Sequence, residues 1–258
     1  MIAWGPVQIE EGKTVAFRIG EVELYLGREG DEWLIANRKI AADEDGIASD
    51  SAAVCGLPEG VQWQRFIGPR EDSLEVFPAL PNRAVVVRPE APVVILPGRH
   101  GQFYFTMPVW VRFLSTHQKG DQVVLEQPSK TLSNIWFGDP VGGELCYSLG
   151  DPLRRDYTDM IGQHGVVICP LHLTNASLER LKFERICVHV EHLNLYRSTD
   201  ALWTNEVDVQ FKGADQMSRI SLSDKPPPNT TLLTERRVPS NRSLLAKSFS
   251  LLRQVTGM

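Results

Sequence analysis

Residues 129–149, SKTLSNIWFGDPVGGELCYSL, decide how the rest of the chain is interpreted. Residues 135–137 are β-branched or aromatic and suit a pleated, half-buried surface. Residues 138–143 are rich in glycine and proline, which favour tight turns. After the turn, Leu145 and Tyr147 alternate with polar or small residues, the period of a strand with one buried face. The stretch is therefore predicted to be a β-hairpin that buries its Leu145 face.

Similar strand patterns recur before and after this hairpin, at a spacing of about 8–12 residues, without a long helical period between them. This spacing is typical of sandwiches and barrels rather than of βαβ units. We predict an all-β protein of two packed β-sandwich-like domains, the second immunoglobulin-like in style. The proline-rich break at residues 78–82 places the N-terminal β domain at residues 1–80 and the β-sandwich domain at residues 81–213.

Two irregularities are expected inside the second domain. Pro108 interrupts the strand-forming run FYFTMPVWVRFL, and proline in sheets is confined mainly to edges and bulges, so the chain is predicted to cross between sheets there. Residues 181–196 give the longest strand pattern, but the buried face changes phase near Glu191 and His192. A β-bulge at this point would produce the change.

The C-terminal region has a different character. Residues 214–239 contain three consecutive prolines and are interpreted as a linker, because such runs favour extended chain. Residues 240–258 carry Leu245, Phe249 and Leu252 at helical spacing and are predicted to form an amphipathic helix. The helix would dock on the body of the protein or on a second subunit, giving a homodimer, and a position on a membrane surface is the alternative.

Composition excludes several classes of protein. The 258 residues carry a formal charge of −5, which argues against nucleic-acid binding and against attraction to an anionic membrane. The longest apolar runs are far shorter than the roughly 20 residues of a transmembrane helix. The N-terminal residues lack the pattern of a secretory signal. We therefore predict a cytoplasmic protein with no transmembrane segment and no nucleic-acid partner.

The chain has four cysteines, at positions 55, 146, 169 and 187, and none are in CxxC spacing. Buried, reduced thiols are the preferred interpretation, so no metal and no cofactor are predicted. Cys169 with His172, and Cys187 with His189, would give a zinc-type cluster if their strands paired. Cys169 and His172 are three residues apart, however, and a regular strand turns such residues to opposite sides. The cluster remains an alternative.

No catalytic residue can be assigned, because the dinucleotide, phosphate-loop, metalloprotease and nucleophile-elbow motifs are all absent. The leading hypothesis is a non-enzymatic binding or interaction module for an unknown protein or small-molecule ligand. Exposed aromatic and charged positions supply the candidate binding residues, Trp136, Asp139, Glu144, Tyr147, Arg154 and Arg155. Trp203 and Tyr196 are further aromatic candidates, and for all four aromatic residues a core position is the preferred interpretation. The alternative is a hydrolase with paired carboxylates between the two domains.

Three segments together resemble a known family. They are the run LSNIWFGDPVGGELCYSL, the preceding FYFTMPVWVRFL and the residues from VVICPLHL to NEV. They resemble the prokaryotic family catalogued as domain of unknown function 432, over residues 4–212, with WFG…GELCY as the most specific part. The resemblance implies no established activity and transfers no catalytic residue. It also links the family to gene neighbourhoods of mechanosensitive channels, which adds a soluble accessory of such a membrane channel as a third hypothesis.

Overall fold

The computed structural model describes residues 4–40, 53–55, 58–68, 73–117, 120–213 and 218–239. Strands dominate these residues, and their helical segments are the two 3-10 turns η1 (Thr158–Met160) and η2 (Val190–His192). The predicted all-β class is therefore confirmed. No helix in this part of the chain has the length and the apolarity to cross a membrane.

The chain divides into two compact units. Unit 1 comprises Met1–Ala79 and Pro108–Lys130, and unit 2 comprises Leu80–Met107 and Thr131–Met258. The sequence predicted two contiguous domains, whereas the units interleave along the chain. The reason is that the hairpin after Pro108 pairs with strand β7 (Ser73–Ala79) of unit 1.

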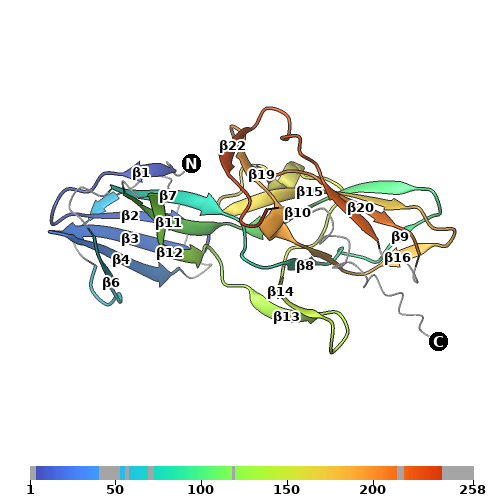
Figure 1. Cartoon of the computed structure of the whole chain (residues 1–258), viewed down its shortest axis with the longest axis horizontal. Helices are drawn as coiled ribbons and strands as arrows, with labels where there is room; N and C mark the ends of the chain where they lie inside the picture. The colour runs from blue at the N-terminus through green and yellow to red at the C-terminus, as the bar shows by residue number, and fades with distance from the viewer. Residues whose placement is uncertain are drawn as a thin grey trace. The chain divides into compact units, whose positions relative to one another are not determined.

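Unit 1 is built from two antiparallel sheets (Figure 1). The first has the order β1-β7-β11-β12, with β1 (Gly5–Val7), β7, β11 (Trp110–His117) and β12 (Gly120–Pro128). The second has the order β5-β2-β3-β4-β6, with β5 (Ala53–Cys55), β2 (Thr14–Ile19), β3 (Val22–Glu29), β4 (Glu32–Lys39) and β6 (Gln64–Ile67). Both sheets contribute fully buried apolar side chains, among them Leu24, Ile35, Leu74 and Phe113.

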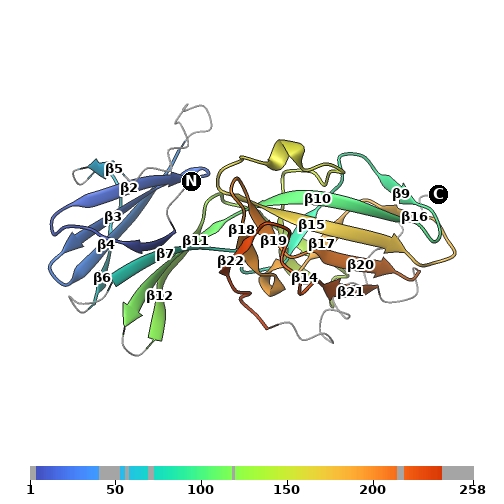
Figure 2. The same ribbon diagram turned by 90° about the horizontal axis from the view of Figure 1, so that it is seen from above.

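Unit 2 contains a long mixed sheet, a four-stranded sheet and a two-stranded ribbon. The long sheet has the order β21-β20-β15-β19-β18-β22, and β10 also pairs with β15 (Figure 2). Its strands are β10 (His100–Pro108), β15 (Val166–Asn175), β18 (Leu195–Arg197), β19 (Leu202–Thr204), β20 (Val207–Phe211), β21 (Arg219–Leu222) and β22 (Thr231–Thr234). The four-stranded sheet has the order β13-β14-β8-β17, with β13 (Ser133–Phe137), β14 (Glu144–Ser148), β8 (Val85–Val87) and β17 (Ile186–Val188). The ribbon pairs β16 (Leu181–Phe183) with β9 (Val93–Ile95).

The predicted hairpin is confirmed, because β13 (Ser133–Phe137) and β14 (Glu144–Ser148) pair antiparallel. The predicted buried face of β14 is wrong. Leu145 is 46% exposed, whereas Cys146 is fully buried against Val86 and Cys187. Val86 on β8 (Val85–Val87) and Cys187 on β17 (Ile186–Val188) pack with Cys146 on one face of the same sheet, so tertiary packing decides which face is buried.

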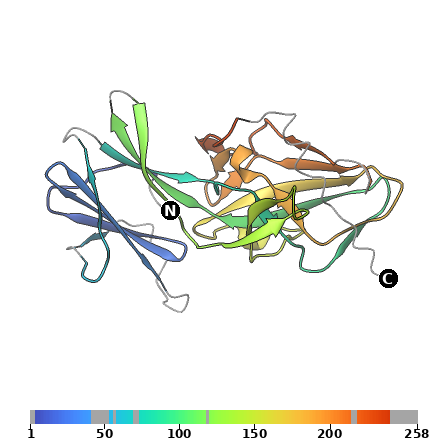
Figure 3. The same ribbon diagram turned by 60° about the horizontal axis from the view of Figure 1, so that its bottom comes forward.

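The predicted crossing at Pro108 is also confirmed. Strand β10 ends at this proline after pairing with β15 in unit 2, and β11 then pairs with β7 and β12 in unit 1. Figure 3 shows β11 and β12 as a hairpin of two green strands. A residue without an N–H group fits a point at which the chain leaves one ladder and enters another.

Two predictions for the later part of the chain are wrong. Residues 181–196 form three short strands and the turn η2 instead of one strand with a β-bulge. Val190, inside η2, is fully buried, so the change of phase comes from a tight turn that packs on the core. Residues 214–239 are not only a linker, because β21 pairs with β20 and β22 pairs with β18. The predicted helix at residues 240–258, and a homodimer through it, lie outside the described residues.

A polar ladder crosses three strands of unit 1. Arg18 on β2 faces Glu23 on β3, and Glu23 faces Arg38 on β4. The Glu23 carboxylate accepts hydrogen bonds from Tyr25 Oη at 2.7 Å, Arg38 Nη2 at 2.6 Å and Arg18 Nε at 3.3 Å. Partial burial raises the pKa of Glu23, but these donors outweigh it and hold the pKa below its ordinary value.

We predict that Glu23→Gln lowers the free energy of unfolding by about 1–2 kcal/mol at neutral pH, because hydrogen bonds to a charged group are lost. A carboxylate with a depressed pKa stabilises the fold above its unfolded pKa, and this contribution disappears as the pH falls through the folded pKa. Urea unfolding of both proteins over a pH series would therefore converge under acid. The control is Glu21→Gln, whose partner Lys130 is about half exposed, with an expected change within about 0.5 kcal/mol. An equal loss at every pH would contradict the prediction.

Candidate functional site

A pocket of about 740 Å³ lies in unit 2, against the long sheet. Its walls come from β10, β15, β19 and the residues around η1, together with the segment between β21 and β22. We name residues 223–229 of that segment the proline segment. It contributes Ser223, Lys225, Pro226–Pro228 and Asn229 to the lining. Because proline fixes the φ angle, three consecutive prolines make this wall stiff.

Three aromatic rings form a row along the pocket. The ring centroids of Tyr104 and Tyr157 are 4.8 Å apart, and those of Tyr157 and Trp203 are 5.3 Å apart. Both contacts are edge-to-face, the arrangement that aromatic pairs prefer. Tyr157 is 40% exposed, and the indole of Trp203 donates to Ser198 Oγ at 3.3 Å. The row therefore lines the pocket with ring surface, and the indole N–H of Trp203 is hydrogen-bonded within the protein.

Charged groups surround the row. Glu206 and Asp200 are acidic lining residues, and Lys225 is basic. The side chain of Gln102 donates from Nε2 to Glu206 Oε2 at 3.3 Å, which fixes the carboxylate beside the rings. Burial raises the pKa of Tyr104, and its neighbours Tyr157 and Glu206 raise it further, so this phenol stays protonated.

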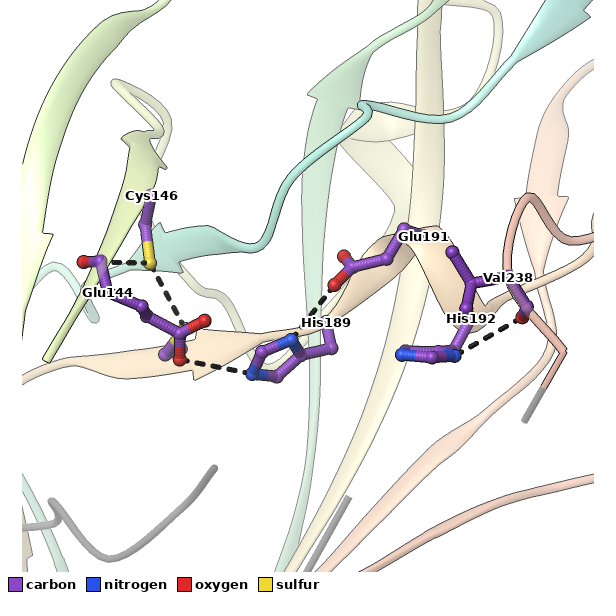
Figure 4. Close-up of polar contacts among 7 residues, drawn as sticks. Glu144, Cys146, His189, Glu191, His192 and Val238 are labelled. Atoms are coloured by element: carbon purple, nitrogen blue, oxygen red, sulfur yellow. Dashed lines mark hydrogen bonds and ion pairs between the residues drawn. The ribbon is translucent and has the colours of Figure 1, made fainter. Parts of the chain in front are cut away.

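A second group of functional side chains lies in the four-stranded sheet of unit 2 (Figure 4). Glu144 and Cys146 are two residues apart on β14, and Cys187 is on β17 with His189 two residues later. The thiols Cys146 Sγ and Cys187 Sγ are 3.6 Å apart. Glu144 Oε1 lies 4.0 Å from Cys187 Sγ and 3.2 Å from His189 Nε2. We call these four residues the Cys/His cluster.

Neighbouring charges set the ionisation of this cluster. Burial lowers the pKa of His189, but hydrogen bonds and charge from Glu144 and Glu191 outweigh it and raise the pKa to about 10. Glu191 Oε1 is bound by His189 Nδ1 at 2.9 Å. The S–H group of Cys187 lowers the pKa of Cys146, and the same contact, with burial, raises the pKa of Cys187. The first thiolate of the pair therefore forms at Cys146.

The candidate residues predicted from sequence do not form one site. Glu144 belongs to the Cys/His cluster. Trp136 and Asp139 shape the hairpin turn, since the indole Nε1 donates to Asp139 O at 3.0 Å and Asp139 Oδ1 accepts from the N–H of Gly142 at 2.7 Å. Tyr147 donates to Asn82 Oδ1 at 2.9 Å.

The two neighbouring arginines also have separate environments. The guanidinium of Arg154 lies 3.8 Å from Asp159 Oδ2, whereas that of Arg155 lies over the ring of Phe103, 4.9 Å from its centroid. They do not face one anion together in the described structure.

The four cysteine and histidine candidates are divided between two sheets. Cys187 and His189 are in the cluster, but Cys169 and His172 are on β15 of the long sheet. Burial raises the pKa of the Cys169 thiol to about 12, so it is inert at neutral pH. His172 packs against His100 with its ring tilted, the ring centroids being 5.1 Å apart, and its Nδ1 lies 3.6 Å from Asp208 Oδ1.

Sequence reasoning missed Cys146 as a cluster member and most of the pocket. Of the aromatic candidates, Trp203 lines the pocket, while Tyr196 is buried. The available signal for the cluster was the pair of alternating motifs, Glu-x-Cys at residues 144–146 and Cys-x-His at residues 187–189. Each motif puts two side chains that can bind a metal ion on one face of a strand.

These features define an all-β protein with an aromatic-walled pocket and a partly buried group of thiol, imidazole and carboxylate side chains. The chain belongs to the family described as "Protein of unknown function (DUF432)", whose model matches residues 3–253. The match extends past residue 212 and includes most of the C-terminal segment. No curated protein and no solved structure matches the chain.

The hairpin turn that positions Glu144 depends on Gly143. A Cβ atom at this position would lie 2.6 Å from Asp139 O and 2.8 Å from Phe137 O, both of them backbone atoms. We predict that Gly143→Ala destabilises the protein by about 1–3 kcal/mol, because the turn has to open to accept the methyl group. The control is Gly150→Ala, two residues beyond β14, where a Cβ atom meets nothing within 4 Å. Thermal unfolding of the two variants would separate them, and equal melting temperatures would contradict the prediction.

Proposed function

We propose that this protein is a non-enzymatic binding protein whose pocket in unit 2 takes a small organic cation or a cationic side chain. The observation that supports the proposal is the row of Tyr104, Tyr157 and Trp203 beside the carboxylate of Glu206. A cation over an aromatic face is attracted by the ring quadrupole, at about 0.5–2 kcal/mol for each ring. A carboxylate beside the rings adds the charge partner.

The remaining lining residues fit recognition of a small molecule. A pocket of about 740 Å³ is within the range of about 300–1,000 Å³ that holds drug-sized ligands. Its walls are aromatic rings and prolines, with a few amides, hydroxyls and carboxylates that can orient a ligand. Asp200 and Glu206 outnumber Lys225, so the charged side chains of the lining favour a positive ligand.

The proposal places the protein in the cytoplasm. Its support is the state of Cys146, Cys169 and Cys187, which are all buried free thiols. Free thiols persist in reducing compartments.

The test compares choline and arginine with choline's neutral carbon isostere, by isothermal titration calorimetry on the full chain. We expect the cations to bind and the isostere to bind at least several-fold more weakly, because it lacks the charge that the rings and Glu206 attract. Equal binding of choline and its isostere, or no binding of any cation, would contradict the proposal.

Variants locate the site. Tyr157→Leu and Glu206→Gln are each expected to weaken choline binding by about 2- to 30-fold, the equivalent of about 0.5–2 kcal/mol. The matched control is Tyr147→Leu, which removes another partly exposed tyrosine of unit 2 that does not line the pocket. A loss of binding in Tyr147→Leu that equals the loss in Tyr157→Leu would move the site away from the pocket.

A further inference from the structure

We propose that Glu144, Cys146, Cys187 and His189 form a site for a zinc-type divalent cation in unit 2. The ligand atoms of Glu144, Cys187 and His189 all lie within 4.8 Å of one another. The sulfur of Cys146 lies outside this group of three but is 3.6 Å from that of Cys187, so a small rotation of its side chain towards the ion would make it the fourth ligand. The sequence alone favoured buried thiols and no metal, because it could not show that β14 and β17 bring their donors together.

Two of the separations are close to those around a tetrahedral ion. With Zn–S bonds of about 2.3 Å and Zn–N or Zn–O bonds of about 2.0–2.1 Å, two sulfurs lie about 3.8 Å apart and a nitrogen–oxygen pair about 3.3 Å apart. The protein has 3.6 Å between the two sulfurs and 3.2 Å between His189 Nε2 and Glu144 Oε1. The distance of 4.0 Å from Glu144 Oε1 to Cys187 Sγ needs to shorten by only about 0.5 Å.

Glu191 provides an independent sign of a metal-binding histidine. A histidine that binds zinc usually donates its other ring N–H to a carboxylate, which fixes the tautomer and the direction of the ring. His189 Nδ1 contacts Glu191 Oε1 at 2.9 Å, and its Nε2 is turned to Glu144 and Cys187 (Figure 4). The His189 side chain is only 10% exposed, so this orientation is held by the surrounding protein.

The order of the strands favours an ion over a disulfide as the link between the thiols. Strand β8 lies between β14 and β17 and pairs with both. In a flat sheet, residues two strands apart are about 9–10 Å apart at Cα, whereas a disulfide requires less than about 7 Å. An ion extends the reach of the two side chains by two metal–sulfur bonds, and therefore needs less movement of the backbone.

The donor set indicates the class of ion and its role. Two thiolates and an imidazole prefer zinc and similar borderline ions to magnesium or calcium. Four protein ligands fill a tetrahedral shell, which is typical of a structural site. On binding, both thiols and the imidazolium lose their protons to solvent, and the ion takes their place. Glu144 is 37% exposed in its side chain, which makes it the most exposed of the four residues.

The test uses the full chain, purified without a metal-binding tag, stripped of metal under reducing conditions and titrated with Co²⁺ and then Zn²⁺. We expect the absorption bands of tetrahedral cobalt with thiolate charge transfer, which saturate at one ion per chain and disappear when zinc displaces cobalt. A folded, reduced chain that gives no thiolate–cobalt bands would overturn the proposal. A Cys146–Cys187 disulfide that reforms after reduction and prevents cobalt binding would also overturn it.

Matched variants assign the ligands. Cys187→Ser and Cys146→Ser are expected to abolish the thiolate–cobalt bands or to weaken them strongly. The control is Cys169→Ser, an equally buried thiol of unit 2 that is in the other sheet, and it should keep the full signal. Far-ultraviolet circular dichroism of each variant shows whether it is folded. If all three variants are folded like the wild type and all three lose the bands, the proposal is wrong, because Cys169 is not a proposed ligand.

Glu191→Gln tests the site even if the cysteine variants do not fold. It removes the charged partner of His189 without removing a proposed ligand, and glutamine preserves the shape of the side chain, so we expect the variant to fold. We expect about 10- to 100-fold weaker zinc binding in competition with a chelator of known affinity. Unchanged zinc affinity in this variant would contradict the role of His189 as a ligand.

Discussion

Strand β8 is the element on which the four-stranded sheet of unit 2 depends. Its three valines, Val85–Val87, are all buried to 1% exposure or less. Buried backbone groups must be hydrogen-bonded, so β8 needs a partner on each edge. It pairs in parallel with β14 on one edge and antiparallel with β17 on the other. This requirement brings the hairpin at residues 133–148 and the strand that starts at Ile186 into one sheet. The side chains of the Cys/His cluster, which these two segments carry, therefore lie close together.

Local patterns were sufficient for the class of fold and for several of its elements. The hairpin, the crossing at Pro108 and the abundance of strands follow from turn residues and from period-two alternation, which act within a few positions of the chain. The face that a strand buries is a different matter. Leu145 is more apolar than Cys146, but Cys146 is buried because Val86 and Cys187 pack against it. Such a partner is distant in sequence and leaves no local sign.

The functional groups could be predicted only in part, for the same reason. Cys187 and His189 were recognised as neighbours on one face of a strand, but their partners Glu144 and Cys146 are about 40 positions earlier, as the 41-residue separation of the two sulfurs shows. The pocket is assembled from β10, the turn η1, β19 and the proline segment. No spacing rule joins these pieces. A parallel pairing such as that between β15 and β19 also has no turn between its strands to mark it.

The pocket and the Cys/His cluster share one structural support, the segment that begins at η2. Val238 N donates to Glu191 O at 3.1 Å, and His192 Nδ1 lies 3.2 Å from Val238 O (Figure 4). Strand β22, which follows the proline segment, pairs with β18 directly after η2. One end of the stiff pocket wall is therefore held by the same turn that carries Glu191, the partner of His189. The chain after the proline segment is thus bonded to the same turn that carries the carboxylate partner of His189, although the two sites use different sheets.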